Sequence, residues 1–485
     1  MQTEQKKRPV VALTGASGYI GSHLLDKLKE RFDIIALSRS GDKRENTEQV
    51  TWRSCDLFSQ IDTEKGLQGA DIAVYLVHSM SPSAKLTQAR FEDMDVILAD
   101  NFAQAAKKNG VKQIVYLSGI IPPEEKLSRH LRSRLEVEKI LGSYGVPVTT
   151  VRAGLIVGPK GSSFPIAEKL VKRLPVMVLP SWTKTKTHPI ALADVLTALQ
   201  KSVGNKDVTD KAIDVGGPDV MTYKEMLEHL AGVMGKKLRS FNVPFPTVKL
   251  SRLWVKLVSG MPKETVYPLI ESLSHPMVAQ PSHYVEGISN GQISFDEAAK
   301  SAMEEEKQSK NSKHSKKTSL PSQPSRQDVR SVQRMPLPSG KDAGWAAKHY
   351  MSWVSDSLHP FVRTEVDEQL NCKIYLTFTK QPLLILSYAK ERSTGHRALY
   401  YITGGLFANV KESQRGRIEF RQIPEKQEMV VAIHEYLPSL PWFVYKYTQA
   451  PIHMLVMFLY RKHLERLISH KQQPGLQIPQ SAAQH

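Results

Sequence analysis

Residues 14–21 read TGASGYIG, which places Gly15, Gly18 and Gly21 three positions apart. An apolar run comes directly before this stretch, and the segment 24–28, Leu-Leu-Asp-Lys-Leu, follows it. The order predicts a strand, a tight glycine turn and a helix whose free N–H groups and positive dipole end can hold a pyrophosphate. Glycines can also serve only to turn a loop, but the flanking strand and helix favour a dinucleotide site.

The length of the chain and its cysteines limit the class of protein. With 485 residues, 41% of them hydrophobic, the chain can form two folded cores. Cys55 and Cys372 have no partner at ligand spacing, so the sequence indicates neither a disulfide framework nor a cysteine-based metal site. The polar N-terminus MQTEQKKRP runs into the first strand without the apolar core of a signal peptide. We therefore expect a cytoplasmic protein.

The formal net charge of +18 raises the question of an anionic partner. Residues 307–341 hold nine Lys or Arg against Asp328 alone and so supply a net eight of these charges. The remaining charge is spread along the chain, and no RNP-like aromatic pattern, zinc-finger spacing or recognition helix accompanies it. The pattern argues against nucleic-acid binding.

Strand-like apolar runs alternate with helical segments over the first 300 residues. The runs lie at 10–14, 33–38, 71–77, 112–118 and 147–152. The helical segments lie at 90–108, 126–141 and 190–203, and a further helix begins with the capping-box pair Thr222 and Glu225. This alternation predicts an α/β fold over residues 9–300, a Rossmann-type doubly wound parallel sheet with helices on both faces.

Residues 301–342 differ in composition from the rest of the chain. They are rich in Lys, Ser, Gln and Pro and contain almost no large apolar side chains. Such a segment cannot bury enough surface to order itself, so we predict a basic flexible linker. Its charge could contact an anionic surface, but a solvated tether is the favoured interpretation.

Residues 343–470 predict a second, smaller α+β domain, followed by a disordered tail over 471–485. A helical segment at 345–360 precedes the strand-like runs. These runs lie at 372–379, 382–389, 397–409, 415–422 and 428–436. The last two flank Pro424, Glu425 and Lys426, a hairpin connection, and hairpin-linked strands predict an antiparallel sheet.

A long helical segment, 442–467, closes this domain and is interrupted at Pro451. Its apolar stretch, 452–460, is much shorter than the ~20 residues that a membrane span needs. We therefore favour a buried helix lying across the sheet. The alternative is peripheral membrane contact through the aromatic residues that precede it. These are Trp442, Phe443, Tyr445 and Tyr447.

Several ordered motifs follow the successive predicted strands. They are Ser38-Arg39, Cys55-Asp56-Leu57, Val77-His78-Ser79, Leu117-Ser118-Gly119, Arg152-Ala153-Gly154, Gly158-Pro159, His188-Pro189-Ile190, Asp194-Val195, Gly216-Gly217-Pro218 and Thr222-Tyr223. Together with TGASGYIG, they resemble the extended and atypical branch of the short-chain dehydrogenase/reductase superfamily, which includes NmrA-like proteins and the complex I accessory-subunit-like group. This likeness covers roughly residues 9–300. Residues 343–470 resemble the helix-grip type of ligand-binding domain.

The resemblance implies a bound nicotinamide dinucleotide and, in the C-terminal domain, an unidentified small or apolar ligand. The residues that it places at the dinucleotide are Thr14, Gly15, Ser17, Gly18, Tyr19, Ile20, Gly21, Ser38, Arg39, Asp56, Leu57, Val77 and His78. The residue spacing of the sequence indicates no metal site. Asp56 would sit beside the adenine, although an Asp after a strand is also a common helix cap.

The charge after the second strand indicates which dinucleotide is bound. A site for NAD(H) usually carries an acid there, which accepts from the ribose 2′-hydroxyl, whereas a 2′-phosphate needs a cation. Here the strand ends in Ser38-Arg39, and no acid appears before Asp42. Arg39, with Arg44 as a second candidate, is therefore placed to pair with a phosphate, and NADP(H) is favoured over NAD(H). A surface arginine with a solvated head is the alternative.

The catalytic pattern departs from the superfamily. A reductase of this type needs an acid, usually a tyrosine with a nearby lysine, and a serine that polarises the carbonyl oxygen. Ser118 stands where the serine belongs, but His130 stands for the tyrosine and Arg134 for the lysine. A neighbouring arginine disfavours the charged form of His130 and so weakens it as an acid. The 16 histidines show no paired metal spacing, and Ser118 lies outside a GxSxG motif.

Two hypotheses remain open from the sequence. In the first, this is an NAD(P)(H)-binding protein in which the nucleotide is a structural or sensing ligand. In the second, it is an active NADP-dependent oxidoreductase that reduces a carbonyl-type substrate with Ser118, His130 and Arg134. Neither hypothesis identifies a substrate or a protein partner.

Overall fold

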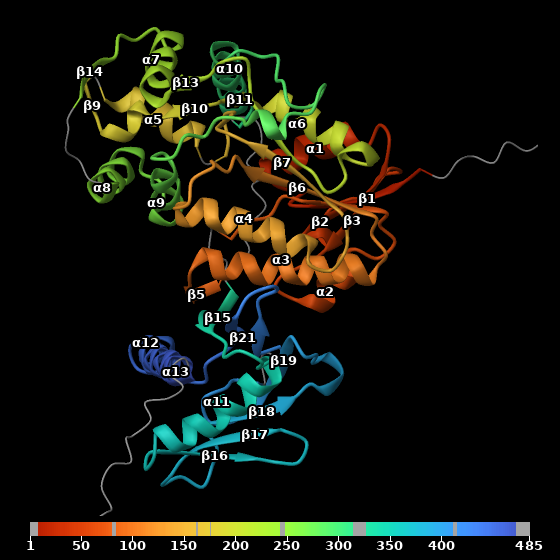
Figure 1. The fold of residues 1–485 in the computed structure, drawn as a ribbon, viewed down its shortest axis with the longest axis vertical. Coiled ribbons are helices and arrows are strands. Elements are labelled where there is room, and N and C mark those ends of the chain that lie inside the picture. Colours follow the sequence, from red (N-terminus) through yellow and green to blue (C-terminus); the bar gives the residue numbers. More distant parts are fainter. Residues whose placement is uncertain are drawn as a thin grey trace, which may run out of the picture. The chain divides into compact units, whose positions relative to one another are not determined.

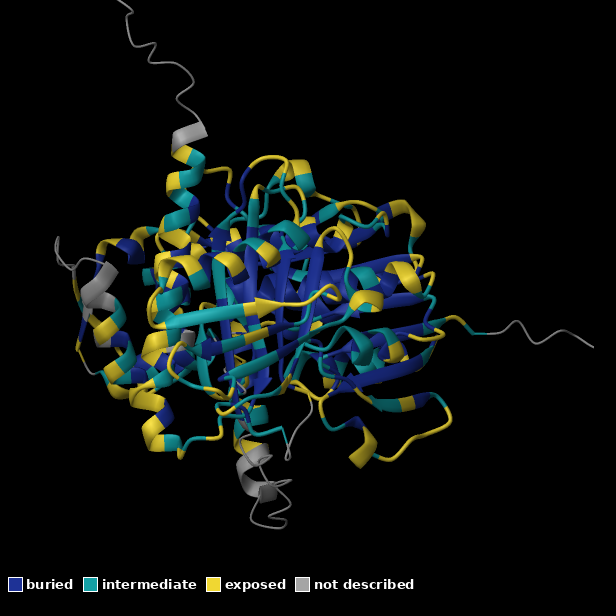
Figure 2. Ribbon diagram, turned by 90° about the horizontal axis from the view of Figure 1, so that it is seen from below, coloured by how far each residue is buried: buried dark blue, intermediate teal, exposed yellow. Residues whose placement is uncertain are grey.

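The computed structural model describes residues 8–79, 84–161, 163–174, 176–242, 248–313, 326–410 and 415–471. The chain forms two compact units (Figure 1). Unit 1 comprises Met1–Ser81 and Asp95–Leu320, and unit 2 comprises Pro82–Met94 and Pro321–His485. Many of the buried residues lie on strands, as Figure 2 shows.

Unit 1 is built on a seven-stranded sheet in the order β12-β7-β6-β4-β1-β2-β3. All six pairs of neighbouring strands are parallel. The strands are β1 (Val10–Thr14), β2 (Asp33–Ser38), β3 (Val50–Ser54), β4 (Ile72–Tyr75), β6 (Gln113–Gly119), β7 (Val148–Ala153) and β12 (Ala212–Val215). Their near-continuous burial is typical of a sheet covered on both faces. The predicted Rossmann-type sheet is confirmed.

Helices cover the two faces of this sheet (Figure 1). One face packs against α1 (Tyr19–Leu28) and α6 (Leu192–Ser202), which share a core with the odd-numbered residues of β1. The opposite face is covered by α2 (Gln60–Gly66), α3 (Phe91–Lys108) and α4 (Arg129–Gly142). The predicted helices at 90–108, 126–141 and 190–203 are therefore confirmed to within a few residues.

The remaining helices of unit 1 form a smaller layer with its own core. They are α5 (Phe164–Arg173), α7 (Tyr223–Val233), α8 (Val248–Ser259), α9 (Lys263–Ser272) and α10 (Phe295–Lys313). The short strands in this layer are β8 (Ile156–Val157), β9 (Val176–Leu179), β10 (Lys186–Thr187), β11 (Ile190–Ala191), β13 (Met221–Thr222) and β14 (Arg239–Asn242). The predicted capping box is present, because Thr222 and Glu225 each accept from the other's backbone N–H.

Unit 2 is an α+β unit with an eight-stranded sheet in the order β16-β17-β18-β19-β20-β21-β15-β5. The strands are β16 (Val362–Val366), β17 (Cys372–Leu376), β18 (Leu384–Tyr388), β19 (Arg397–Gly404), β20 (Arg417–Gln422), β21 (Glu428–Tyr436), β15 (Arg326–Pro336) and β5 (Ala84–Ala89). The sheet is antiparallel except for β15 and β5, which pair in parallel. The predicted class is confirmed, but the sheet is mixed rather than antiparallel.

The segment predicted as a linker, 301–342, contains regular structure at both ends. Helix α10 continues to Lys313, because Ala298, Ala299 and Ala302 anchor it in the core of unit 1. Strand β15 begins at Arg326 and hydrogen-bonds to a strand on each side. Backbone pairing thus orders a segment whose composition is polar. Residues 314–325, and 472–485 of the predicted tail, lie outside the described residues.

One face of the unit 2 sheet packs against α11 (Ala343–Ser357) and α13 (Gln449–Lys471). The short helix α12 (Trp442–Tyr447) comes before α13. The helical segment is therefore interrupted at Thr448, and not at Pro451 as predicted. Proline is tolerated in the first turn of a helix, where the N–H has no intrahelical partner. Among the described residues, no helix is long and apolar enough to cross a bilayer.

The opposite face of this sheet carries buried charges around Glu419. Its carboxylate accepts from Arg397 Nε at 2.7 Å, Arg421 Nη2 at 3.2 Å and His434 Nε2 at 3.0 Å. All four side chains are buried. Burial alone would raise the pKa of Glu419, but the surrounding Arg421, Arg397 and His434 hold it well below its ordinary value. Glu419 on β20 therefore links β20 to β19 and β21 through its contacts with Arg397 and His434.

Replacing His434 with glutamine is expected to make unit 2 less sensitive to acid. Burial lowers the pKa of His434 from 6.5 to about 4. Because the folded pKa lies below the unfolded value, the unfolded state gains a proton first, and stability is lost as the pH falls from 6.5 towards 4. At pH 5, protonation of His434 in the unfolded state should lower the free energy of unfolding by about 2 kcal/mol. Urea unfolding at pH 7 and pH 5 measures the difference, and an unchanged pH dependence in H434Q would refute it.

Candidate functional site

The glycine turn lies between β1 and α1 and is shaped by close backbone contacts. Gly15 has a φ of +65°, which favours glycine, and its carbonyl accepts from Gly18 N–H at 2.8 Å. A Cβ on Gly21 would lie 2.1 Å from the Gly15 carbonyl oxygen, so only glycine fits there. Helix α1 has no acidic residue in its first turn and no side-chain cap. Its N-terminal N–H groups are therefore available to an anion.

The position of this turn in the sheet also fits a dinucleotide. The chain runs from β1 to β2 and β3 on one side, and β4 then begins the other side. Dinucleotides bind at such a switch point, outside the carboxyl ends of the strands. Leu76 and Val77, which follow β4, lie 3.6 Å and 3.7 Å from where a Cβ of Gly15 would stand. His78 comes next and is exposed.

Two predicted contact residues have side chains that are engaged elsewhere. The Thr14 hydroxyl donates to the Val74 carbonyl and accepts from Leu76 N–H, both at 3.0 Å, and so clamps β1 to β4. The Tyr19 hydroxyl lies 3.3 Å from Glu305 Oε2 on α10. Thr14 therefore shapes the site from within the sheet, and the Tyr19 hydroxyl is engaged by α10. Ser17 and Gly18 are exposed in the turn, and Ile20 is half-buried beside them.

The carboxyl end of β2 presents a cation. Arg39 is exposed and makes no ion pair among the described residues, whereas the carboxylate of Asp42 accepts from the backbone N–H of Ser54 at 3.1 Å. The Ser38 hydroxyl accepts from Ser40 N–H at 3.3 Å and shapes the same turn. Arg44 lies with its guanidinium carbon 4.5 Å from the centre of the Trp52 ring. The nearest acid is thus bound to the backbone, and Arg39 remains free to contact a ligand.

Asp56 and Leu57 form the turn after β3. The Asp56 carboxylate accepts from Phe58 N–H at 3.2 Å, and the Leu57 carbonyl accepts from Asn101 Nδ2 at 2.8 Å. These bonds hold the turn against α3 at the same edge of the sheet as the glycine turn. Asp56 does not cap helix α2, which was the alternative interpretation, because the side-chain cap of α2 comes from Ser59.

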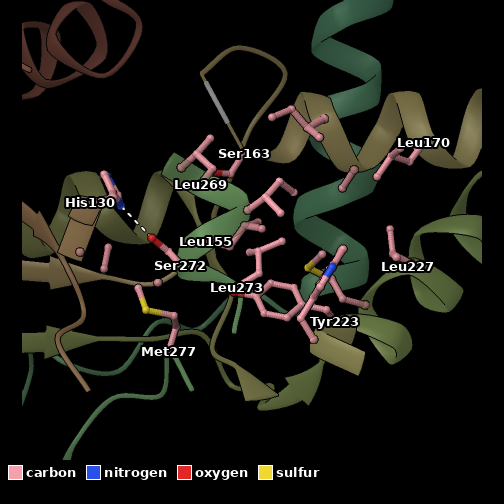
Figure 3. A pocket seen from close by; sticks show the side chains of 18 residues that line it. His130, Leu155, Ser163, Leu170, Tyr223, Leu227, Leu269, Ser272, Leu273 and Met277 are labelled. Carbon is pink, nitrogen blue, oxygen red and sulfur yellow. Dashed lines mark hydrogen bonds between the residues drawn. The ribbon is translucent and has the colours of Figure 1, made fainter. Parts of the chain in front are cut away.

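A pocket opens beyond the ends of β6 and β7 and encloses about 850 Å³, open solvent at its mouth included (Figure 3). Gly119, Ala153 and Gly154 line it at the ends of β6 and β7. His130 and Ser272 lie together at one side, as Figure 3 shows. The other lining side chains are mainly apolar and come from α5, α7, α9 and nearby loops. They include Ile166, Leu170, Trp182, Tyr223, Leu227, Leu269, Leu273 and Met277. Among the described residues, no Lys, Arg, Asp or Glu lines the pocket.

Both ring nitrogens of His130 are engaged. Nε2 is 3.4 Å from Arg134 Nε, which can only donate, so Nε2 accepts and the proton resides on Nδ1. Nδ1 lies 3.2 Å from the hydroxyl oxygen of Ser272, as Figure 3 shows. That hydroxyl in turn donates to the Pro268 carbonyl at 3.0 Å. His130 is thereby fixed between α4 and α9.

The electrostatic surroundings keep His130 neutral. Burial and, next, the guanidinium of Arg134 lower the pKa of His130 well below 6.5. The same two causes lower the pKa of His78 to about 4, although His78 is accessible to solvent at the surface. A neutral His130 whose Nδ1 proton is already donated is a poor acid at pH 7. The sequence expectation of a weakened acid agrees with this geometry.

Arg134 belongs to a buried polar cluster under the pocket. Its Nη2 lies 3.7 Å from Asp95 Oδ2, and Asp95 also accepts from Ser79 N–H at 2.7 Å. Burial raises the pKa of Asp95, and Arg134 and these hydrogen bonds oppose that rise. Ser118 is buried near this cluster, beside Tyr116. The three predicted catalytic residues therefore lie in one region, but only His130 lines the pocket.

Sequence reasoning missed several residues of this region. Asp95 belongs to no motif, Ser79 stands in the Val77-His78-Ser79 motif without an assigned contact to Asp95, and Ser272 lies 142 positions after His130 along the chain. Trp182 and Tyr223 reach the pocket from separate short elements of the smaller layer. Although Tyr223 belongs to the Thr222-Tyr223 motif, no local pattern assigns these residues to a pocket, because only the fold brings them to the ends of β6 and β7.

Comparison with known proteins identifies the first part of the chain. Residues 15–169 match the protein family described as NAD(P)H-binding. This part of the chain is an NAD(P)-binding domain. The match begins at Gly15, directly after β1, and includes the glycine turn, the strands from β2 to β7 and helix α4. The predicted relation to atypical short-chain dehydrogenases/reductases is confirmed.

Three curated relatives resemble parts of this chain. The auxiliary protein GraX of Staphylococcus aureus is 33% identical over 144 residues, which is 30% of this chain and 43% of GraX. Sanguinarine reductase of Eschscholzia californica is 29% identical, covering 44% of this chain and 90% of the reductase. The mouse mitochondrial NADH dehydrogenase 1 alpha subcomplex subunit 9 is 23% identical, covering 52% of this chain and 67% of the subunit. The chain thus spans less than half of GraX.

A solved structure shows the same fold. A nucleoside-diphosphate-sugar epimerase of Staphylococcus aureus matches 60% of this chain and 99% of its own chain, with a TM-score of 0.50 and 16% identity. At this identity the likeness shows the Rossmann-type fold alone.

Proposed function

We propose that this protein binds NADP(H) in preference to NAD(H). The observation that carries the proposal is the pair formed by an exposed Arg39 at the end of β2 and an Asp42 whose carboxylate is bound to the backbone of Ser54. A guanidinium there can pair with a 2′-phosphate, whereas Asp42, the first acid after β2, is engaged by the backbone of Ser54. The pyrophosphate would lie on the turn of Gly15, Gly18 and Gly21.

In this proposal the nucleotide serves as a structural or sensing ligand. The support comes from His130, which stands where the superfamily has its tyrosine. It is neutral, its Nε2 accepts from Arg134, and its Nδ1 proton is donated to Ser272. Tyr75 and Tyr116 are core residues with less than 2% exposure, and burial raises the pKa of Tyr223, which lines the pocket, to about 12. The described pocket therefore offers no group prepared to protonate a carbonyl oxygen.

The alternative is an NADP-dependent oxidoreductase that uses Ser118, His130 and Arg134. The pocket favours it, because an apolar cavity beside His130 at the ends of β6 and β7 could hold a substrate. Without a charged lining residue, such a substrate would be neutral and largely apolar. His130 would have to break its bond to Ser272 before it could donate a proton.

Following NADPH absorbance with a panel of apolar aldehydes and ketones separates the two roles. The ligand role predicts NADPH binding without turnover of any panel member. Turnover that is lost in H130A and kept in R132A, an exposed residue of the same helix, would establish the enzyme instead. Turnover kept in both variants would exclude His130 as the acid.

Two further statements belong to the same proposal. The cytoplasm is the proposed compartment, consistent with Cys55 and Cys372, which are both free and buried. That unit 2 binds an apolar ligand stays a prediction. The sheet face next to α11 and α13 does not support it, because the side chains of these helices fill that face. A protein partner is not assigned.

Replacing Arg39 with aspartate is expected to reverse the cofactor preference. Loss of the guanidinium and the added negative charge should weaken NADPH binding about tenfold to a hundredfold, since a hydrogen bond to a charged group is worth about 1.5–3 kcal/mol. NADH affinity should stay equal or rise. R31D, an exposed arginine before the start of β2, is the matched control and should leave both affinities unchanged. If R39D still bound NADPH more tightly than NADH, Arg39 would not be the contact of the 2′-phosphate.

A further inference from the structure

The last two helices of unit 2 carry an exposed apolar surface. Seven large apolar side chains of α12 and α13 are between 39% and 73% exposed. They are Phe443, Val444, Tyr447, Ile452, Leu455, Phe458 and Leu459, and we refer to them as the α12–α13 surface. Apolar patches on this scale are uncommon on monomeric soluble proteins and mark interaction sites.

The core of unit 2 does not need these side chains. Helix α13 reaches the core through Met457, Tyr460 and Leu464, which are at most 2% exposed. Ile452, Leu455 and Leu459 follow one another at positions i, i+3 and i+7 and so form a separate stripe on the outer side of the helix. The first half of α13 therefore has two apolar sides: one packs into the core of unit 2, and the other is exposed and is not needed for that core.

Cations accompany the apolar stripe. Residues 442–471 contain five Lys or Arg and one acid, Glu465. Continuing the stripe along α13 leads to the exposed side chains of Lys462 and Arg466. Lys462 and Arg461 already engage Glu465, with Lys462 Nζ at 2.7 Å, so the acid does not offset the remaining cations. Lys446 lies exposed within α12, between Phe443 and Tyr447.

Aromatic residues mark the start of this surface. Trp442 packs beside Tyr445, with ring centres 5.8 Å apart, and Lys85 Nζ lies 4.2 Å from the Trp442 ring centre. Tyrosine and tryptophan favour the boundary between headgroups and acyl chains, where lysine and arginine can contact lipid phosphates. An apolar stripe flanked by cations and aromatic residues matches the interfacial class of membrane contact.

We propose that the α12–α13 surface docks on an anionic phospholipid bilayer. Phe443, Leu455 and Phe458 enter the boundary of the acyl chains, and Lys446 and Arg466 lie among the headgroups. The helices lie along the membrane surface, consistent with the finding that no described helix could span it. This inference is independent of dinucleotide binding, because every residue that it uses belongs to unit 2.

Flotation of the full-length protein with lipid vesicles tests the proposal. We expect binding to vesicles of 70% phosphatidylcholine and 30% phosphatidylglycerol, and at least about tenfold weaker binding to phosphatidylcholine alone or in 0.5 M NaCl. The double variant L455S/F458S should bind the anionic vesicles at least about tenfold more weakly. F361S/F378S is the matched control, since both phenylalanines are exposed in unit 2 outside α12 and α13.

A charge variant and the oligomeric state complete the test. K446E/R466E should lose the anionic preference, whereas K373E/K380E, on and after β17, should keep it. Equal binding to neutral and anionic vesicles, or unchanged binding by both α12–α13 variants, would overturn the proposal. A wild-type dimer that L455S/F458S converts to a monomer would also overturn it, because the surface would then be covered by a second copy of the chain.

Discussion

Replacing Gly21 with alanine is expected to abolish dinucleotide binding. The added Cβ would stand 2.1 Å from the Gly15 carbonyl oxygen and 2.8 Å from its carbon, distances that no rotamer can relieve. Helix α1 would have to move away from the turn, and the phosphate-binding N–H groups move with it. We expect at least a hundredfold loss of NADPH affinity, equivalent to about 2.7 kcal/mol or more. Calorimetric titration with NADPH measures it.

A second glycine provides the control for this variant. Gly232 also lies within a helix, α7, but a Cβ there would meet nothing within 4 Å. G232A should bind NADPH as the wild type does and gain about 0.5–1 kcal/mol of stability, the usual difference between alanine and glycine in a helix. If G21A bound NADPH as tightly as G232A, the turn would not be the phosphate site.

Replacing Glu419 with alanine is expected to unfold unit 2 at much lower denaturant concentrations. The carboxylate is 1% exposed and is contacted by Arg397, Arg421 and His434, which are also buried. Removing one partner of a buried ion pair costs about 3–5 kcal/mol, because the opposite charges stay in a medium of low dielectric. Guanidinium unfolding followed by far-ultraviolet circular dichroism should show this loss.

An exposed glutamate gives the matched comparison. Glu465 on α13 also contacts two cations, Arg461 and Lys462, but at the surface, where solvent screens the charges. E465A should therefore unfold at nearly the same guanidinium concentration as the wild type. An equal, small effect of E419A and E465A would show that the buried network does not stabilise unit 2.

The parallel sheet of unit 1 could be predicted from the sequence because its information is local. The predicted strand at 10–14 and the helix at 90–108 lie within one residue of the observed elements. The pair Thr222 and Glu225 is similarly local, since a capping box spans four residues. Each of these features needs only its own neighbours in the chain.

Unit 2 could be predicted only in part, because its sheet is completed by distant segments. Strand β5 at 84–89 pairs with β15, more than 230 positions later along the chain. Neither strand has the alternating apolar pattern that predicts a strand, and β15 falls in a segment whose composition predicts a linker. Their order comes from backbone hydrogen bonds to neighbouring strands, which no local pattern records.

The candidate site could be predicted at its nucleotide end and less so at its pocket. Arg39 follows its strand directly, so its position was evident. The engagement of Tyr19 by Glu305 and of His130 by Ser272 could not be foreseen, since each partner comes from a helix far along the sequence. Through these contacts the Tyr19 hydroxyl is engaged by α10 and the His130 proton is already donated to Ser272.

Calorimetric titration of the full-length wild type with NADPH and with NADH tests the central claim most directly. The exposed Arg39 and the committed carboxylate of Asp42 predict that NADPH binds at least about tenfold more tightly, since the 2′-phosphate adds a charge-assisted hydrogen bond. Equal affinity for the two nucleotides, or binding of neither, would contradict the account.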